Sequence, residues 1–168
     1  ESNDKQVKVI QLIQAYRNRG HQVASIDPLG MMDREQIPDL DIEYHGLSKE
    51  DLQTVFNTDT LRIGKDEASL QEIINSLQSI YCGDLGVEYN HIVDIDERKW
   101  FQEKLELNVG KFDFKDDEKK YIFNRLNSAE GLAKFLAAKY PGMKRFGIDG
   151  CESLIPLVDA LIQNCGIY

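Results

Sequence analysis

Residues 5–20 read KQVKVIQLIQAYRNRG, and this stretch indicates the type of secondary structure on which the fold is built. Its apolar residues recur at steps of three and four positions, which places them on one face of a helix. Arg17 and Arg19 suit the negative end of the helix dipole, and Gly20 suits a left-handed cap after the last turn. The stretch therefore predicts an amphipathic helix over residues 5–19.

The same periodicity continues along most of the chain. It predicts further helices over residues 48–56, 69–82, 94–107, 116–126 and 128–140 and from residue 152 onward. Trp100, Phe101 and Leu105 are expected to face inward. DPLG at 27–30 predicts a turn, and residues 87–93 favour a short strand or an extended segment. The expected fold class is mostly α, with about seven helices and hardly any strand.

Composition and charge narrow the class of protein. The chain has 168 residues and a formal net charge of −9, which repels a phosphate backbone, so we expect no nucleic acid partner. Its three cysteines lack C-x-x-C spacing, which indicates a reducing compartment. The sequence shows neither a signal-peptide pattern nor a long uncharged apolar run, so we expect a cytoplasmic protein with no membrane association.

The residue types that most often carry chemistry are scattered. His21, His45 and His91 have no metal-ligand spacing, so no metal site is expected. Cys151 precedes a predicted helix, but no histidine follows it closely enough in sequence to be identified as its base. Structural roles are therefore the simpler interpretation of these residues.

The most suggestive local pattern is KRFGIDG at residues 144–150, directly before the last predicted helix. Lys144 and Arg145, two glycines and a helix N-terminus can together receive an anion. The alternative is a turn in which Arg145 pairs with Asp149 or Glu152. The residues alone leave both interpretations open.

Several stretches, taken in order, carry a family resemblance. They are YRNRGH at 16–21 with DPLG at 27–30, YCG at 81–83 with GVEY at 86–89 and HI at 91–92, KWFQEK at 99–104, and KRFG at 144–147 with ESLIP at 152–156. Together these stretches resemble the first component of 2-oxoglutarate dehydrogenase, the thiamine-diphosphate-dependent decarboxylase. MMDREQ at 31–36 departs from the acidic calcium-linked loop of the animal mitochondrial branch, which favours a bacterial enzyme over one of the mitochondrial matrix.

The resemblance implies oxidative decarboxylation of 2-oxoglutarate, a small-molecule 2-oxo acid, followed by succinyl transfer to lipoyl groups in the tricarboxylic acid cycle. It implies thiamine diphosphate and magnesium as cofactors of the full-length enzyme. It also implies two partners, a second copy of the same subunit and the lipoyl-bearing succinyltransferase core. In this family the cofactor-binding elements follow the segment matched here, so we expect an amino-terminal fragment that is inactive alone and binds no cofactor.

The resemblance also implies a domain division and a site. A helical N-terminal domain is expected over residues 1–140, and the truncated start of the thiamine-diphosphate-binding α/β domain over residues 141–168. No catalytic set is complete in this fragment, but Arg145, with Lys144 as weaker support, is expected near the dianionic substrate or the cofactor. An independent helical interaction module and a 2-oxoadipate-specific relative remain open. An exposed final helix favours the fragment, and one buried against its own chain favours the module.

Overall fold

The computed structural model describes residues 2–108 and 114–167. These residues form five α-helices, short 3₁₀ helices and one two-stranded sheet, which confirms the mostly α prediction. They divide into two compact units, Glu1–Phe112 and Asp113–Tyr168. None of the described helices is long and apolar enough to cross a membrane.

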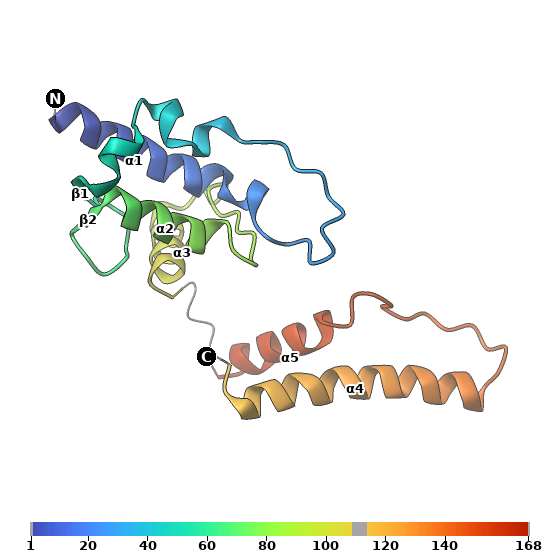
Figure 1. The fold of residues 1–168 in the computed structure, drawn as a ribbon. Coiled ribbons are helices and arrows are strands. Elements are labelled where there is room, and N and C mark those ends of the chain that lie inside the picture. The colour runs from blue at the N-terminus through green and yellow to red at the C-terminus, as the bar shows by residue number, and fades with distance from the viewer. Residues whose placement is uncertain (1, 109–113, 168) are drawn as a thin grey trace. The chain divides into compact units, whose positions relative to one another are not determined.

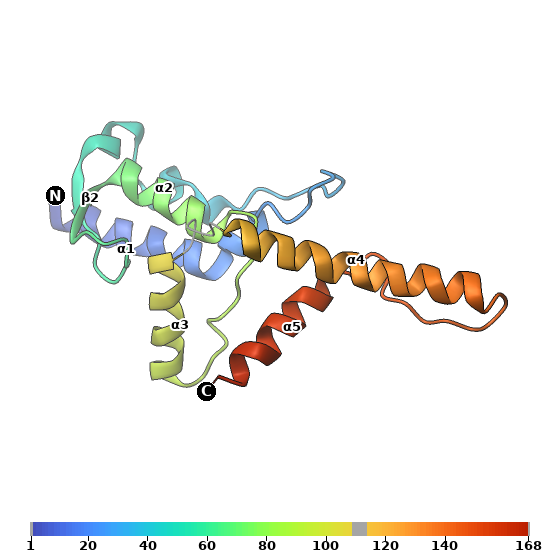
Figure 2. The same cartoon turned by 90° about the horizontal axis from the view of Figure 1, so that it is seen from below.

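Helices α1 (Ser2–Arg19) and α2 (Leu70–Tyr81) lie side by side at the centre of the first unit (Figure 1). Figure 2 shows the same pairing from below. The helices bury most of the apolar residues that recur along them in the sequence, but Val7 of α1 is exposed. The buried side chains are Val9, Leu12, Ile13 and Tyr16 on α1, and Leu70, Ile73, Ile74, Leu77, Ile80 and Tyr81 on α2. Each large apolar side chain buried in this way contributes about 1.5–3 kcal/mol to folding.

Gly20 allows the end of α1 to approach the end of α2 closely. A Cβ atom added at Gly20 would lie 2.5 Å from the Cβ atom of Tyr81, closer than two carbon atoms can pack. Gly20 begins the 3₁₀ helix η1 (Gly20–Val23) and is not among the glycines with positive φ. The predicted left-handed cap is therefore wrong, and the missing side chain is what this position requires.

A serine followed three residues later by an acidic residue occurs before two helices, and the two pairs start helices of different kinds. The sequence allowed either Ser69 or Asp66 to start α2, and Ser69 is the residue that caps it. Its Oγ accepts from the amide of Glu72, whose carboxylate accepts from the amide of Ser69. The equivalent pair of Ser48 and Asp51 starts only a short 3₁₀ helix, η4 (Lys49–Gln53).

The chain then extends into strand β1 (Val55–Asn57), which is antiparallel to β2 (Glu67–Ser69). The prediction of a helix over residues 48–56 is therefore wrong beyond Gln53. In the strand Phe56 points into the core while Val55 is exposed, because successive side chains alternate between the two faces of a sheet.

The turn at residues 27–30 is confirmed. The amide of Gly30 donates to the carbonyl of Asp27 at 3.2 Å, and Gly30 adopts a φ of 62°. The Asp27 carboxylate accepts from the amides of Leu29 and Met32, at 3.2 and 2.7 Å. This local bonding explains why the chain bends here without help from the core.

The last helix of the first unit, α3 (Ile95–Asn108), starts at Asp94, whose side chain accepts from the amides of Asp96 and Glu97 at 2.9 Å. Leu105 is buried as expected, but the expected burial of Trp100 and Phe101 is wrong, since these residues are 59% and 36% exposed. The predicted short strand over residues 87–93 is absent from the described part of the chain. The chain turns there instead, and the amide of Ile92 donates to the carbonyl of Tyr89 at 3.0 Å.

The second unit consists of α4 (Asp116–Lys139) and α5 (Leu154–Cys165), with α5 lying along the first half of α4 (Figure 1). The two helices predicted over residues 116–126 and 128–140 are one continuous helix. Ser128 does not restart it, because its hydroxyl donates back to the carbonyl of Asn124 at 2.7 Å. Pro156 lies in the first turn of α5, as the sequence requires.

Polar contacts hold the two helices of this unit together. Arg125 of α4 forms an ion pair with Asp159 of α5 at 2.9 Å, and the hydroxyl of Tyr121 donates to the same carboxylate. α4 therefore groups with α5 in one compact unit, and the division into compact units lies between residues 112 and 113.

Candidate functional site

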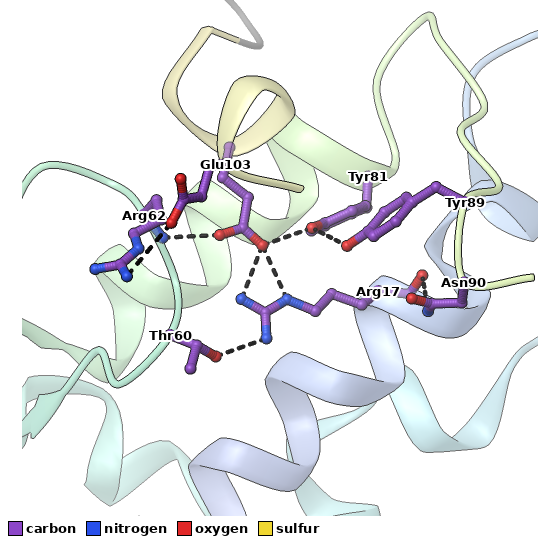
Figure 3. A network of polar contacts seen from close by, with 8 residues as sticks. Arg17, Thr60, Arg62, Tyr81, Tyr89, Asn90 and Glu103 are labelled. Atoms are coloured by element: carbon purple, nitrogen blue, oxygen red, sulfur yellow. Dashed lines mark hydrogen bonds and ion pairs between the residues drawn. The ribbon is translucent and has the colours of Figure 1, made fainter. Parts of the chain in front are cut away.

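A buried polar network lies in the first unit, where α1, α2 and α3 meet the loops beside them (Figure 3). Its centre is an ion pair between Arg17 of α1 and Glu106 of α3, whose side chains are only 3% and 0% exposed. Arg17 Nε donates to Glu106 Oε1 at 2.8 Å, and Arg17 Nη1 donates to Thr60 Oγ1 at 2.8 Å. A buried charge pair is tolerated only when its remaining polar atoms are also satisfied.

The other bonds to Glu106 come from α2 and from the loop before it. The hydroxyl of Tyr81 donates to Glu106 Oε1 at 2.7 Å, and the backbone amide of Arg62 donates to Oε2 at 2.8 Å. The hydroxyl groups of Tyr81 and Tyr89 lie 3.1 Å apart. Both carboxylate oxygens of Glu106 are therefore engaged by donors from three different segments.

Electrostatics favour the protonated forms of Tyr81 and Arg17 in this network. Burial, and then the negative charge of Glu106, raise the pKa of Tyr81 far above its ordinary value, so its phenol stays protonated and donates. Burial lowers the pKa of Arg17, but the hydrogen bond and charge of Glu106 outweigh this effect and the net shift is upward. A protonated phenol and a charged guanidinium that bond to the same carboxylate suit the joining of helices.

The sequence of this chain is similar to the sequences of several known bacterial proteins. The chain is 49% identical over 168 residues to the 2-oxoglutarate dehydrogenase E1 component of Azotobacter vinelandii, a match that covers 100% of this chain and 18% of that protein. The chain is homologous to a part of the 2-oxoglutarate dehydrogenase E1 component. No protein-family model matches it.

Two further bacterial relatives have similar names and similar levels of identity to this chain. The E1 component of Cupriavidus necator is 44% identical over 162 residues, covering 96% of this chain and 17% of that protein. The 2-oxoglutarate dehydrogenase E1/E2 component of Corynebacterium glutamicum is 44% identical over 165 residues, covering 96% of this chain and 13% of that protein. The chain thus spans less than a fifth of the length of these relatives and corresponds to a small amino-terminal part of them.

Three of the stretches that carried the E1 resemblance meet at the buried network. Arg17 comes from YRNRGH, Tyr81 from YCG and Tyr89 from GVEY, while Glu106 follows KWFQEK on the same helix. Sequence reasoning missed Glu106 and Thr60. The available signal was a carboxylate beside Leu105 on the buried side of a predicted helix, where an unpaired charge would be costly.

The predicted site residues of the E1 resemblance lie in the other unit. Lys144 and Arg145 are exposed in the connection between α4 and α5, and neither forms an ion pair in the described part of the chain. The carboxylate of Glu152 instead accepts from the amide of Gly150 at 3.0 and 3.1 Å. The turn therefore forms without a pairing of Arg145 with Asp149 or Glu152 among the described residues.

The histidines and Cys151 are separate from one another. His21 Nε2 lies 3.7 Å from Glu88 Oε2, and His45 Nε2 bonds to the carbonyl of Asp39 at 2.8 Å. Cys151 is exposed. Within residues 2–108 and 114–167 no group of three or more His, Cys, Asp or Glu side chains is arranged to hold a metal ion.

Proposed function

We propose that this chain is the amino-terminal part of a 2-oxoglutarate dehydrogenase E1 component, which oxidatively decarboxylates 2-oxoglutarate and transfers the succinyl group to lipoyl groups. The observation that carries the proposal is the 49% identity to the Azotobacter vinelandii E1 component over all 168 residues. A likeness of this extent spans both compact units and all the stretches that resemble the family. The bacterial relatives support a bacterial cytoplasmic enzyme.

The surface of α5 supports the interpretation as part of a larger protein. Leu157, Leu161 and Ile162 are exposed on this helix, and Pro156 is its one buried residue among those described. An apolar helix face of this kind is suited to packing against further protein. This surface favours the fragment over an independent helical module.

The cofactors and partners belong to the proposal for the full-length enzyme. Thiamine diphosphate with magnesium would supply the decarboxylation chemistry there. The described residues of this chain include no cluster of three or more His, Cys, Asp or Glu side chains that could hold the magnesium ion. A second copy of the subunit and the lipoyl-bearing succinyltransferase core are the proposed partners. The name of the Corynebacterium glutamicum relative, an E1/E2 component, supports association with such a core.

Within that enzyme, the first unit would serve as a rigid helical support. The network around Arg17 and Glu106 joins three helices and two loops through buried charged bonds, which resist local opening. Residues 141–168 would begin the cofactor-binding α/β domain. In that setting Arg145, supported by Lys144, would face the dianionic substrate or the cofactor, since its guanidinium is exposed and free of ion pairs in the described part of the chain.

A chimera tests the proposed function. This chain replaces the matched segment of the Azotobacter vinelandii E1 component, and decarboxylation of 2-oxoglutarate is measured with an artificial electron acceptor. We expect the chimera to retain most of the parent activity and a version lacking the segment to lose it. A folded chimera that binds the cofactor yet does not turn over 2-oxoglutarate would refute the proposal. Turnover of 2-oxoadipate in preference to 2-oxoglutarate would assign the chain to the other relative.

A further inference from the structure

A polar hollow of about 780 Å³ opens beside the buried network of the first unit, between α1, α3 and the loops that carry Thr60 and Asn90. Its volume lies within the range of about 300–1,000 Å³ that is typical of pockets for small ligands. None of the roles described above uses this hollow. Four of the residues that line it are cationic, namely Arg17, Arg62, Arg98 and Lys99.

The charges around the hollow are unbalanced. Arg17 also borders it, but Glu106 neutralises that guanidinium from the buried side. Three further cations, Arg62, Arg98 and Lys99, face a single carboxylate, Glu103. In a chain with a formal net charge of −9, a concavity with this excess of positive charge concentrates anions locally.

Several donors of the hollow are available to a ligand. Lys99 and Arg98 form no ion pair in the part of the chain that the structure describes, and Arg98 only donates a long bond of 3.4 Å to the carbonyl of Ile92. Arg62 Nη2 lies 3.5 Å from Glu103 Oε1, and both side chains are about half exposed. Gln14 and Gln102 add amide donors that no other described residue engages.

We propose that this hollow binds a small organic anion with at least two negatively charged groups, either phosphates or carboxylates. Guanidinium and ammonium groups bind both through charge-assisted hydrogen bonds. Donors that come from two helices and a loop favour a multivalent ligand over a single monovalent anion. The proposal concerns the first unit alone and does not depend on the proposed enzymatic activity.

Titration of the 168-residue chain tests this site. Pyrophosphate and citrate serve as the phosphate and carboxylate probes, and acetate at the same ionic strength serves as the monovalent probe. Binding is followed by calorimetry and by the amide resonances of residues 98–103. We expect saturable binding of pyrophosphate, citrate or both that shifts these resonances, and no saturation with acetate. The stronger of the two probes identifies the preferred charged group.

Paired variants make the test specific. Lys99→Gln and Arg98→Gln should each weaken binding by about tenfold or more, as expected for loss of a charged hydrogen bond. Glu103→Gln removes the one carboxylate of the lining and should strengthen binding severalfold. Lys104→Gln changes the same charge on the same helix outside the lining and should leave binding within about twofold. Circular dichroism establishes that each variant is folded.

Three outcomes would overturn the proposal. The first is the absence of saturable binding of both multivalent probes to the folded chain. The second is equal weakening by Lys99→Gln and Lys104→Gln, which would indicate nonspecific attraction. The third is tighter binding of an acidic peptide, such as hexaglutamate, than of both small probes at the same resonances, which would assign the hollow to a protein segment.

Discussion

Arg17 and Glu106 are 89 positions apart in the chain, yet their side chains bond at 2.8 Å in the buried centre of the first unit. This pair connects the first helix of the unit to its last helix. Breaking such a pair by removing one partner leaves a buried charge without compensation. The stability of the unit should therefore depend strongly on either residue.

Glu106→Gln tests this dependence. The amide has almost the same shape as the carboxylate but cannot neutralise Arg17, so we expect the free energy of unfolding to fall by about 3–5 kcal/mol. Urea denaturation at pH 7 measures the change. Glu103→Gln on the same helix is the matched control. It removes a half-exposed pair with Arg62 and should cost at most about 1 kcal/mol. Similar losses in both variants would mean that burial of the Arg17 pair is energetically unimportant.

Gly20→Ala tests the close approach of α1 and α2. The new methyl group would meet the Cβ atom of Tyr81 at 2.5 Å, so we expect a loss of about 1–3 kcal/mol from forced movement of the backbone. Gly131→Ala in the interior of α4 meets nothing within 4 Å and should instead stabilise its helix by about 0.5–1 kcal/mol. Thermal unfolding measures both variants. An unchanged melting temperature for Gly20→Ala would show that the helix ends can separate freely.

The pH dependence of stability should reveal the bond between Asp51 and Lys5. The pKa of Asp51 lies below its ordinary value of 3.8, first because Lys5 donates to its carboxylate and then because the amide of Ser48 does. The folded state therefore binds this proton less tightly than the unfolded state. Asp51 stabilises the fold above the unfolded pKa, and this contribution disappears as the pH falls through the folded pKa.

The comparison uses the melting temperatures of the wild-type chain and of Asp51→Asn between about pH 8 and pH 2. The wild type should melt higher near neutral pH, and the difference should narrow below about pH 4. A difference that stays constant across this range would show that the charge of Asp51 contributes nothing.

The cysteines should differ in reactivity. Burial raises the pKa of Cys82 to about 11, so its thiol stays almost entirely protonated, and therefore a weak nucleophile, at pH 8. Cys151 and Cys165 are exposed. A chromogenic disulfide reagent at pH 8 should therefore modify two thiols rapidly and the third only after denaturation. Cys82→Ser should leave the rapid phase unchanged, and a third rapid thiol in the native wild type would contradict the packing around Cys82.

Arg145→Lys tests the proposed substrate-facing role in the chimeric E1 component. A guanidinium can engage a carboxylate through two hydrogen bonds and an ammonium cannot, so kcat/KM should fall by the equivalent of about 1.5–3 kcal/mol. The melting temperature should stay nearly unchanged. Lys144→Gln should have the smaller kinetic effect. Normal kinetics with a lower melting temperature would show that Arg145 only stabilises the turn.

Much of the secondary structure could be predicted because its causes are local. The apolar stripe of α1, the Ser69 cap of α2 and the turn at Asp27 each depend on residues within a few positions of one another. The resemblance to E1 components likewise lies in short stretches, and the comparison with relatives confirms it. The roles of Lys144 and Arg145 remain predictions, because they concern contacts with the substrate or the cofactor.

The sequence by itself therefore determined the helices with strong periodicity and the family to which the matched segment is homologous. Only the tertiary structure decided that Val55 lies in a strand, that Trp100 is exposed and that Glu106 is the buried partner of Arg17. Periodicity and capping act over about one turn of helix, so both patterns can be recognised in a short stretch of sequence. Strand pairing and the burial of a charge depend instead on contacts between residues that are far apart in the sequence. Glu106, for example, lies 89 positions from Arg17, the residue whose charge it balances.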